Sequence, residues 1–236
     1  MLGRLLAIFA HPDDESYGPA GTLVEAVSSG HAVRVVIATR GDAGSLGISK
    51  QYEPHELARI RQGELLDAAA ILGVEAIILG WPDKGVSAVD PDLGVATLVR
   101  EIRRFRPDSL LTFHPNGLSG HPDHIAITAL AISAERAAAD PAFGPGLGAA
   151  WTTADHWHYA LPESKALAVA HFREMRTVSD DAIDEIMDVS CHTVRKESAC
   201  LAHVTQRDFH RQLQDARGGL HEFWSREHLV RANRVR

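Results

Sequence analysis

The stretch that decides the fold is Leu5-Leu6-Ala7-Ile8-Phe9, followed directly by Ala10-His11-Pro12-Asp13-Asp14-Glu15. An apolar run that ends at a proline and acidic residues predicts a buried β-strand that stops abruptly. Two adjacent carboxylates beside an imidazole repel each other unless a cation or a proton lies between them. We therefore expect a strand whose carboxyl end carries a polar loop suited to a metal ion.

Strands and helices alternate through the first 140 residues. Apolar and β-branched runs predict strands at residues 5–10, 33–38, 75–79 and 108–113, and helical periodicity predicts helices at residues 18–28, 54–72, 93–105 and 125–139. This alternation indicates an α/β fold, Rossmann-like and doubly wound, with a mostly parallel sheet. In the strand order 3-2-1-4-5, the first and fourth strands are neighbours, and ligands bind beyond their carboxyl ends.

After residue 140 the pattern is looser. We expect strands at residues 157–161 and 186–189, and helices at residues 164–175, 194–204 and 209–216. No stretch resembles a linker long enough to separate a second domain. The expected organisation is one domain over residues 1–236, with a Rossmann-like core at residues 1–140 and a C-terminal cap region with helices at residues 141–236.

Composition disfavours several classes of protein. The 236 residues carry a net charge of −7, so nucleic acid and anionic membranes are poor default partners. Cys191 and Cys200 give no disulfide framework, and the opening apolar run is too short for a signal peptide or a membrane span. We expect a cytoplasmic protein that acts on a small molecule, with the oligomeric state, including a homo-oligomer, left open.

A second polar motif, Gly120-His121-Pro122-Asp123-His124, follows the predicted fourth strand. Proline suits the first helical position, so His121 is the expected N-cap, and His121 and His124 share one helix face. Asp123 is then placed to hydrogen-bond His121 and hold it cationic, ready to stabilise an oxyanion.

The two motifs together supply the donors of a catalytic metal site. Two histidines and one aspartate leave a fourth position open, which is typical of catalytic zinc, and the same donor set also accepts iron(II). Asp13 does not easily bind the metal together with its neighbour Asp14, so we expect it to act as general base toward water.

These paired motifs resemble those of the N-acetylglucosaminyl-phosphatidylinositol de-N-acetylases and their bacterial LmbE-like relatives. The similarity continues through Gly41-Asp42-Ala43-Gly44, the helix with Arg61 and Glu64, Gly80-Trp81-Pro82-Asp83, and Ala202-His203-Val204-Thr205-Gln206. Thr205 stands where the family often has serine, and residues 141–185 match little, which leaves the substrate open.

The resemblance implies a zinc-dependent hydrolase that removes an acetyl group from an N-acetylglucosamine-containing or related metabolite. It implies that His11, Asp14 and His124 bind the metal, that Asp13 is the base and His121 the assisting acid, and that Asp42, Arg61 and Asp83 contact the substrate.

Other interpretations of the same residues remain. The first motif is also a plausible acidic N-cap of the following helix, and Arg61 and Glu64 have the spacing of an intrahelical ion pair. Cys191, Cys200 and His203 suggest a second zinc site, but nine residues of helix separate the cysteines by about 13.5 Å, so we expect buried, inert thiols.

Two other functions compete with the deacetylase. One keeps the metal site and cleaves a larger acyl group from a thiol-sugar conjugate or an antibiotic precursor. The other is a Rossmann-like module that binds a nucleotide without catalysis. No Gly-x-Gly-x-x-Gly follows the first predicted strand, which argues against the nucleotide.

Overall fold

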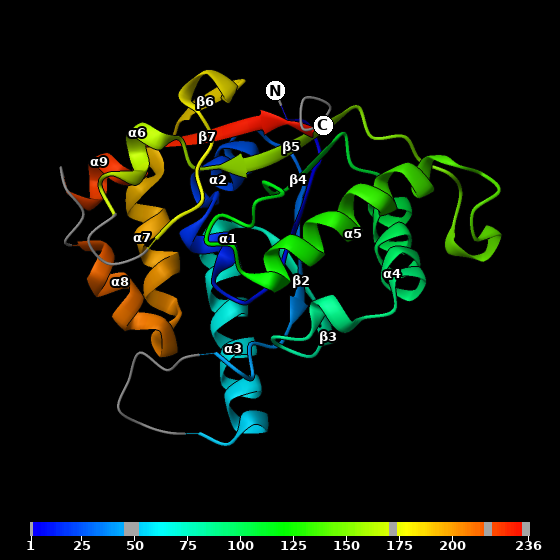
Figure 1. The fold of residues 1–236 in the computed structure, drawn as a ribbon, viewed down its shortest axis with the longest axis horizontal. Helices are drawn as coiled ribbons and strands as arrows, with labels where there is room; N and C mark the ends of the chain where they lie inside the picture. The colour runs from blue at the N-terminus through cyan, green and yellow to red at the C-terminus, as the bar shows by residue number, and fades with distance from the viewer. Residues whose placement is uncertain (1, 45–51, 170–173, 215–218, 233–236) are drawn as a thin grey trace.

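A seven-stranded sheet in the order β3-β2-β1-β4-β5-β7-β6 runs through the molecule (Figure 1). The computed structural model describes residues 2–44, 52–169, 174–214 and 219–232. Its strands are β1 Leu5–Phe9, β2 Val33–Thr39, β3 Glu75–Trp81, β4 Ser109–Phe113, β5 Asp155–Ala160, β6 Glu185–Asp188 and β7 Arg226–Arg231. The first five are parallel, whereas β7 runs antiparallel to both β5 and β6.

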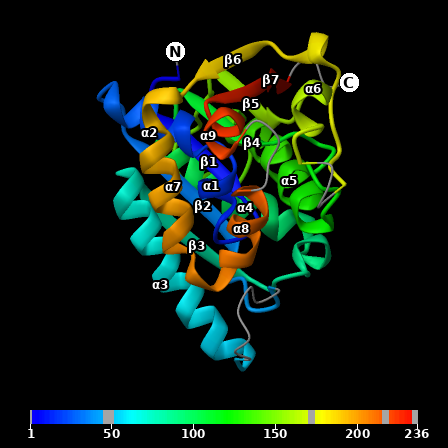
Figure 2. The ribbon, with the colours of Figure 1, turned by 90° about the vertical axis from the view of Figure 1, so that its left-hand side faces the viewer.

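Helices cover both faces of this sheet. They are α1 Asp14–Tyr17, α2 Ala20–Ser28, α3 Pro54–Leu72, α4 Pro91–Phe105, α5 Pro122–Ala139, α6 Glu163–Ala166, α7 Thr193–Ala202, α8 Arg207–Gln214 and α9 Leu220–Trp224. Figures 1 and 2 show α4 and α5 on one face and α2, α3 and α7 on the other. In the described part of the chain, no helix combines the length and the apolar character that a membrane crossing needs.

The central strands are apolar because both of their faces are covered. Every residue of β1 and β4 is buried, which is typical of parallel strands between two helical layers. Leu5 pairs with Val33 of β2 on one side and with Ser109 of β4 on the other. The loops that follow β1 and β4 therefore leave the sheet at the same edge, as the strand order predicted.

The segment after residue 140 differs from our expectation at α6, α9 and β7. The helix expected at residues 164–175 is only the short α6, with residues 170–173 outside the described part of the chain. The helix expected at 209–216 corresponds to α8, and residues 215–216 again lie outside the description. We did not predict α9 or β7. The sequence of β7 is strongly charged, and this segment forms a strand through its pairing with β5 and β6.

Candidate metal centre and cavity

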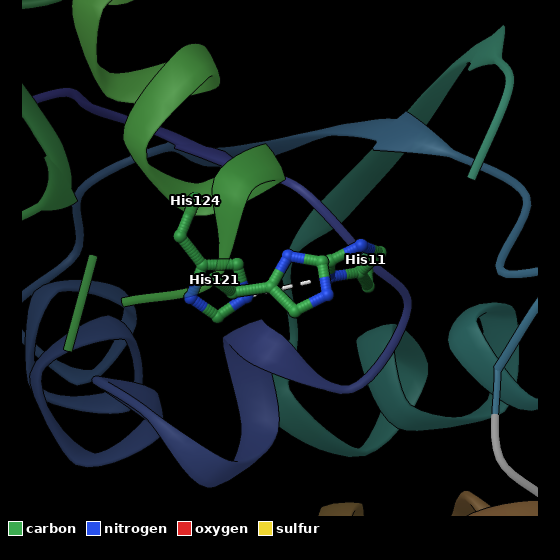
Figure 3. Close-up of side chains that lie close together, drawn as sticks. All are labelled: His11, His121 and His124. Atoms are coloured by element: carbon green, nitrogen blue, oxygen red, sulfur yellow. Dashed lines mark hydrogen bonds between the residues drawn. The ribbon is translucent and has the colours of Figure 1, made fainter. Parts of the chain in front are cut away.

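The loops after β1 and β4 bring the two polar motifs together (Figure 3). His11 comes from the first loop, and His121 and His124 come from the start of α5. His11 Nδ1 and His124 Nε2 lie 3.3 Å apart although 113 residues separate them in sequence. The ring centroids of His11 and His121 are 4.8 Å apart. Three imidazoles thus surround one point at the edge of the sheet.

Asp14 completes a set of three metal donors with His11 and His124. Its carboxylate lies 3.6 Å from His11 Nδ1 and 3.3 Å from His124 Nε2. In a tetrahedral zinc site with bonds of about 2.0–2.1 Å, neighbouring donor atoms are about 3.3–3.4 Å apart. The donor atoms of this chain have nearly that spacing, so the three side chains form a candidate metal site that fits zinc.

Hydrogen bonds to the other ring nitrogens orient both histidines. His124 Nδ1 lies 3.1 Å from the carbonyl oxygen of Gly117, and its ring stacks on Phe113 with centroids 4.1 Å apart. His11 Nε2 lies 3.2 Å from a carboxylate oxygen of Asp123 and 3.2 Å from one of Asp83. Each ring uses one nitrogen for these hydrogen bonds and turns the other toward the candidate metal position, an arrangement common around protein metal sites.

Asp123 contacts a different histidine from the one we expected. Its fully buried carboxylate accepts hydrogen bonds from His11 Nε2 and from the backbone N–H groups of Lys84 and Val86. Only its backbone N–H contacts His121, by donating to Nδ1 at 3.2 Å. The side chain of the N-cap residue His121 caps the helix, while that of Asp123 turns toward the loop after β3.

His121 is consequently not held cationic. Burial lowers its pKa, and the nearby His11 and His124 lower it further. Because Nδ1 accepts a hydrogen bond, the proton of the neutral ring lies on Nε2. His121 therefore offers the cavity a neutral N–H donor in place of the imidazolium that we predicted.

In the metal-free protein, a proton on His11 supplies the positive charge between the carboxylates. Burial lowers the pKa of His11, but hydrogen bonds to Asp123, Asp14 and Asp83 outweigh it and raise that pKa to about 12. The pKa of Asp14 stays well below its usual value because His124 and His11 stabilise the charged carboxylate against burial. Since a metal-bound imidazole carries no proton on its ligating nitrogen, a metal ion held here would require loss of the His11 proton.

Asp13 lies beside this centre in a strained backbone conformation. Its φ of 112° is in the left-handed region, which non-glycine residues seldom adopt. It occupies the N-cap position of α1, yet its side chain makes no capping hydrogen bond, so the simple N-cap interpretation is wrong. Burial raises the pKa of Asp13 to about 6, although the guanidinium of Arg61 opposes this shift.

Arg61 holds Asp13 from the side of α3. The guanidinium is almost fully buried and donates to Asp13 Oδ2 at 3.1 Å, to the carbonyl of Pro12 and to the carbonyl of Gly41. Glu64 accepts hydrogen bonds from Thr205 instead. The predicted intrahelical ion pair of Arg61 with Glu64 is therefore wrong, because each side chain reaches a different loop.

A cavity of about 330 Å³ opens over the metal donors. Its charged side is lined by His11, Asp13, Asp14, Arg61, Asp83, Lys84, His121 and His124. Apolar residues of the lining, here called the apolar wall, are Leu118, Leu161, Val169, Met175 and Phe223. Of the three predicted substrate contacts, Arg61 and Asp83 line this cavity, whereas Asp42 is not among its lining residues.

Sequence reasoning missed Lys84 and the apolar wall. Lys84 lies directly after the quoted Gly80-Trp81-Pro82-Asp83 turn, and its positive φ of 60° has no local sequence signal. Wall residues such as Leu161 and Phe223 have no motif around them, so no pattern distinguished them from core positions.

The two cysteines do not form a second metal site together. Cys200 is buried as expected, but Cys191 is exposed because it lies in a 3₁₀ turn at residues Ser190–His192 before α7. His203, the third residue considered, bonds Glu15 at 2.7 Å.

Several known proteins are similar to this chain in sequence. The family model described as PIG-L, GlcNAc-PI de-N-acetylase, matches residues 6–135. A 1D-myo-inositol 2-acetamido-2-deoxy-alpha-D-glucopyranoside deacetylase of Geodermatophilus obscurus is 33% identical over 86% of this chain and 82% of its own length. A mycothiol S-conjugate amidase of Streptomyces coelicolor is 37% identical over 58% of this chain and 53% of its own length.

Solved structures share the fold. A conserved protein of Thermus thermophilus, TT1542, superposes with a TM-score of 0.72 at 23% identity, over 98% of this chain and 94% of that one. The zinc-inhibited form of a teicoplanin deacetylase superposes with a TM-score of 0.63 at 17% identity, over 98% of this chain and 100% of that one. From the matched family model and the full-length relatives, this chain belongs to the PIG-L or LmbE-like family of N-deacetylases, hydrolases of carbon–nitrogen bonds other than peptide bonds.

Proposed function

We propose that this protein uses zinc to hydrolyse the acetamide of an N-acetylglucosamine-containing small molecule, with a glucosaminyl inositol as the first substrate to test. The observation that carries the proposal is the convergence of His11, Asp14 and His124, with Asp13 beside them in the lining of one cavity. The 33% identity to a deacetylase of such a glucosaminyl inositol supports the choice of substrate.

His11, Asp14 and His124 would hold the zinc ion. When bound there, zinc supplies a Lewis acid that polarises the amide carbonyl and makes water easier to deprotonate. Asp83 and Asp123 keep the His11 ring in the orientation that presents Nδ1 to this position.

Asp13 is the proposed base. It accepts a proton from water as the water oxygen attacks the acetyl carbon, and it returns that proton to the nitrogen as the carbon–nitrogen bond breaks. The products are acetic acid and the amine, which separate in solution as acetate and an ammonium group, so the enzyme gains and loses no proton. Arg61 keeps the Asp13 carboxylate in place during both steps.

His121 is proposed to bind the carbonyl oxygen. Its Nε2–H is available because Nδ1 already accepts the N–H of Asp123. A neutral N–H donor strengthens its hydrogen bond as negative charge develops on that oxygen in the transition state. Arg61 and Asp83 also remain candidate substrate contacts since both line the cavity.

A second candidate function is cleavage of a larger acyl group. The apolar wall favours it, because a single acetyl methyl needs little of the apolar surface that Leu161, Met175 and Phe223 provide. The similarity to a mycothiol S-conjugate amidase supports it over part of the chain. A nucleotide-binding module without catalysis has no such support.

The test is metal content paired with amine release. Purified protein should hold about one zinc per chain, and amine should appear from N-acetylglucosaminyl inositol and stop after chelation. A panel of N-acyl glucosamines with longer chains separates the two hydrolase functions, because only the second predicts faster release from the longer acyl groups. Both hydrolase functions would be refuted if the protein bound neither zinc nor iron(II) and released no amine from any compound of the panel.

A further inference from the structure

Glu15 and His203 form a buried pair behind Asp13. Both side chains are fully buried, and His203 Nε2 donates to Glu15 Oε1 at 2.7 Å. Ser16 Oγ donates to the same oxygen at 2.6 Å. The pair joins α1 to the turn after α7, across 188 residues of sequence. Glu15 ends the motif that carries His11 and Asp14, and His203 belongs to the motif at residues 202–206, but neither side chain is a metal donor.

The second oxygen of Glu15 holds the backbone of Asp13. Glu15 Oε2 accepts the backbone N–H of Asp13 at 3.0 Å. Asp13 is the residue with φ of 112°, a conformation that persists only where surrounding contacts hold it. Glu15 thus restrains the main chain at Asp13, while Arg61 restrains its carboxylate.

His203 is held in turn by Glu15. Its Nδ1 is buried without a hydrogen-bond partner in the described part of the chain, so Nε2 makes the bond that orients the ring. Burial lowers the pKa of His203, but the Glu15 carboxylate raises it and prevails. The two side chains therefore depend on each other for position.

We propose that Glu15 and His203 are a positioning pair that keeps Asp13 in its left-handed conformation and its carboxylate aimed at the reacting water. Through His203, the turn after α7 contributes to catalysis, although neither His203 nor Glu15 lines the cavity. This inference rests on the proposed role of Asp13 as base.

A second buried pair in the same molecule provides a matched control. Glu227 is also fully buried and accepts hydrogen bonds from the backbone N–H groups of Gly21 and Thr22 and from Lys196 Nζ. It joins β7 to α2 and α7, and its bonds are made away from Asp13. Loss of Glu227 should weaken the fold as much as loss of Glu15, without the same effect on turnover.

The experiment compares His203→Phe, which keeps the ring volume without a donor, with His203→Gln, whose amide keeps a donor near the Nε2 position. Glu15→Gln and Glu227→Gln are measured beside them. We expect kcat for N-acetylglucosaminyl inositol to fall by about 10- to 100-fold in His203→Phe and Glu15→Gln, as for a small misplacement of a catalytic group. KM and zinc content should stay near wild type.

His203→Gln should recover most of the lost kcat, and Glu227→Gln should lower the unfolding midpoint with kcat within about twofold of wild type. Unchanged kcat in His203→Phe, or an equal loss in Glu227→Gln, would overturn the proposal. If His203→Phe does not fold, kcat of Glu15→Gln is compared with kcat of His203→Gln, and a loss in the first variant alone supports the positioning role.

A structural measurement keeps this inference separate from the proposed function. In a crystal structure of His203→Phe, or of Glu15→Gln if that variant alone folds, Asp13 should leave the left-handed region. If Asp13 keeps φ near 112° there, the positioning role is refuted even if no substrate has been found. Wild-type protein inactive on every amide would instead refute the proposed function.

Discussion

The two sides of the cavity are built in different ways. The charged side comes from the loops after β1, β3 and β4, the start of α5 and Arg61 of α3, and its side chains are fixed by buried hydrogen bonds such as those of Asp123. The apolar wall comes, apart from Leu118, from segments after β5, and shape rather than hydrogen bonding sets its contacts. We infer that the charged side carries the reaction and the wall selects the substrate, which changes on each side can test.

Asp14→Ala should have the largest effect. Asp14 is the one anionic member of the three proposed donors, and two neutral imidazoles alone bind zinc weakly, so zinc should be lost and turnover should fall to background. Metal analysis of the purified variant checks this, with Asp67→Ala on the exposed face of α3 as the control. Stoichiometric zinc in Asp14→Ala would remove Asp14 from the donor set.

Asp13→Asn should come next. Asparagine tolerates positive φ and keeps the shape of the side chain, but it cannot accept the proton of water. We expect zinc content to be unchanged and kcat to fall by about two to four orders of magnitude. Turnover close to wild type would show that another group is the base.

Asp123→Asn should have a smaller effect, through His11. The amide weakens the acceptor that orients the His11 ring, so zinc affinity should fall by about 10- to 100-fold. Competition with a zinc-binding dye measures this affinity. An unchanged zinc affinity would mean that Asp83 alone suffices to orient His11.

Activity should depend on pH through Asp13. The base works only when ionised, and burial raises its pKa to about 6, so kcat/KM should fall as pH falls through that region. Below it the loss is about tenfold per pH unit. A bound cation lowers the pKa of a neighbouring carboxylate, so the acid limb should lie at or below about pH 6. An acid limb well above about pH 7 would assign the titration to another group.

Phe223→Ala tests the apolar wall and should have the smallest effect. Loss of the ring removes apolar contact area, so kcat/KM should fall by about tenfold for substrates with an apolar acyl or aglycone group. For plain N-acetylglucosamine the change should stay within about twofold, and zinc content should not change. An equal loss on both substrates would mean that the wall does not select between them.

The order of the first five strands and the meeting of the two motifs were predictable from sequence. Parallel strands that are buried on both faces have nearly continuous apolar sequences; β1 is fully apolar, and β4 departs from this only at Ser109 and Thr112. Polar motifs that follow these two strands must lie close together, because the carboxyl ends of neighbouring parallel strands are at the same edge of the sheet. This argument placed His11 and Asp14 beside His121 and His124, and the family resemblance then selected His11, Asp14 and His124 as the predicted metal ligands.

The tertiary structure alone decided which buried groups became partners. Asp123 lies next to His121 and His124 in sequence, yet its carboxylate bonds His11, 112 residues away. Spacing in the sequence indicates which face of a helix a side chain occupies. The hydrogen-bond partners of a buried carboxylate depend instead on which donors of neighbouring loops pack against it. The strand β7, the apolar wall and the pairing of Glu15 with His203 have the same origin, since each depends on contacts between segments far apart in the chain.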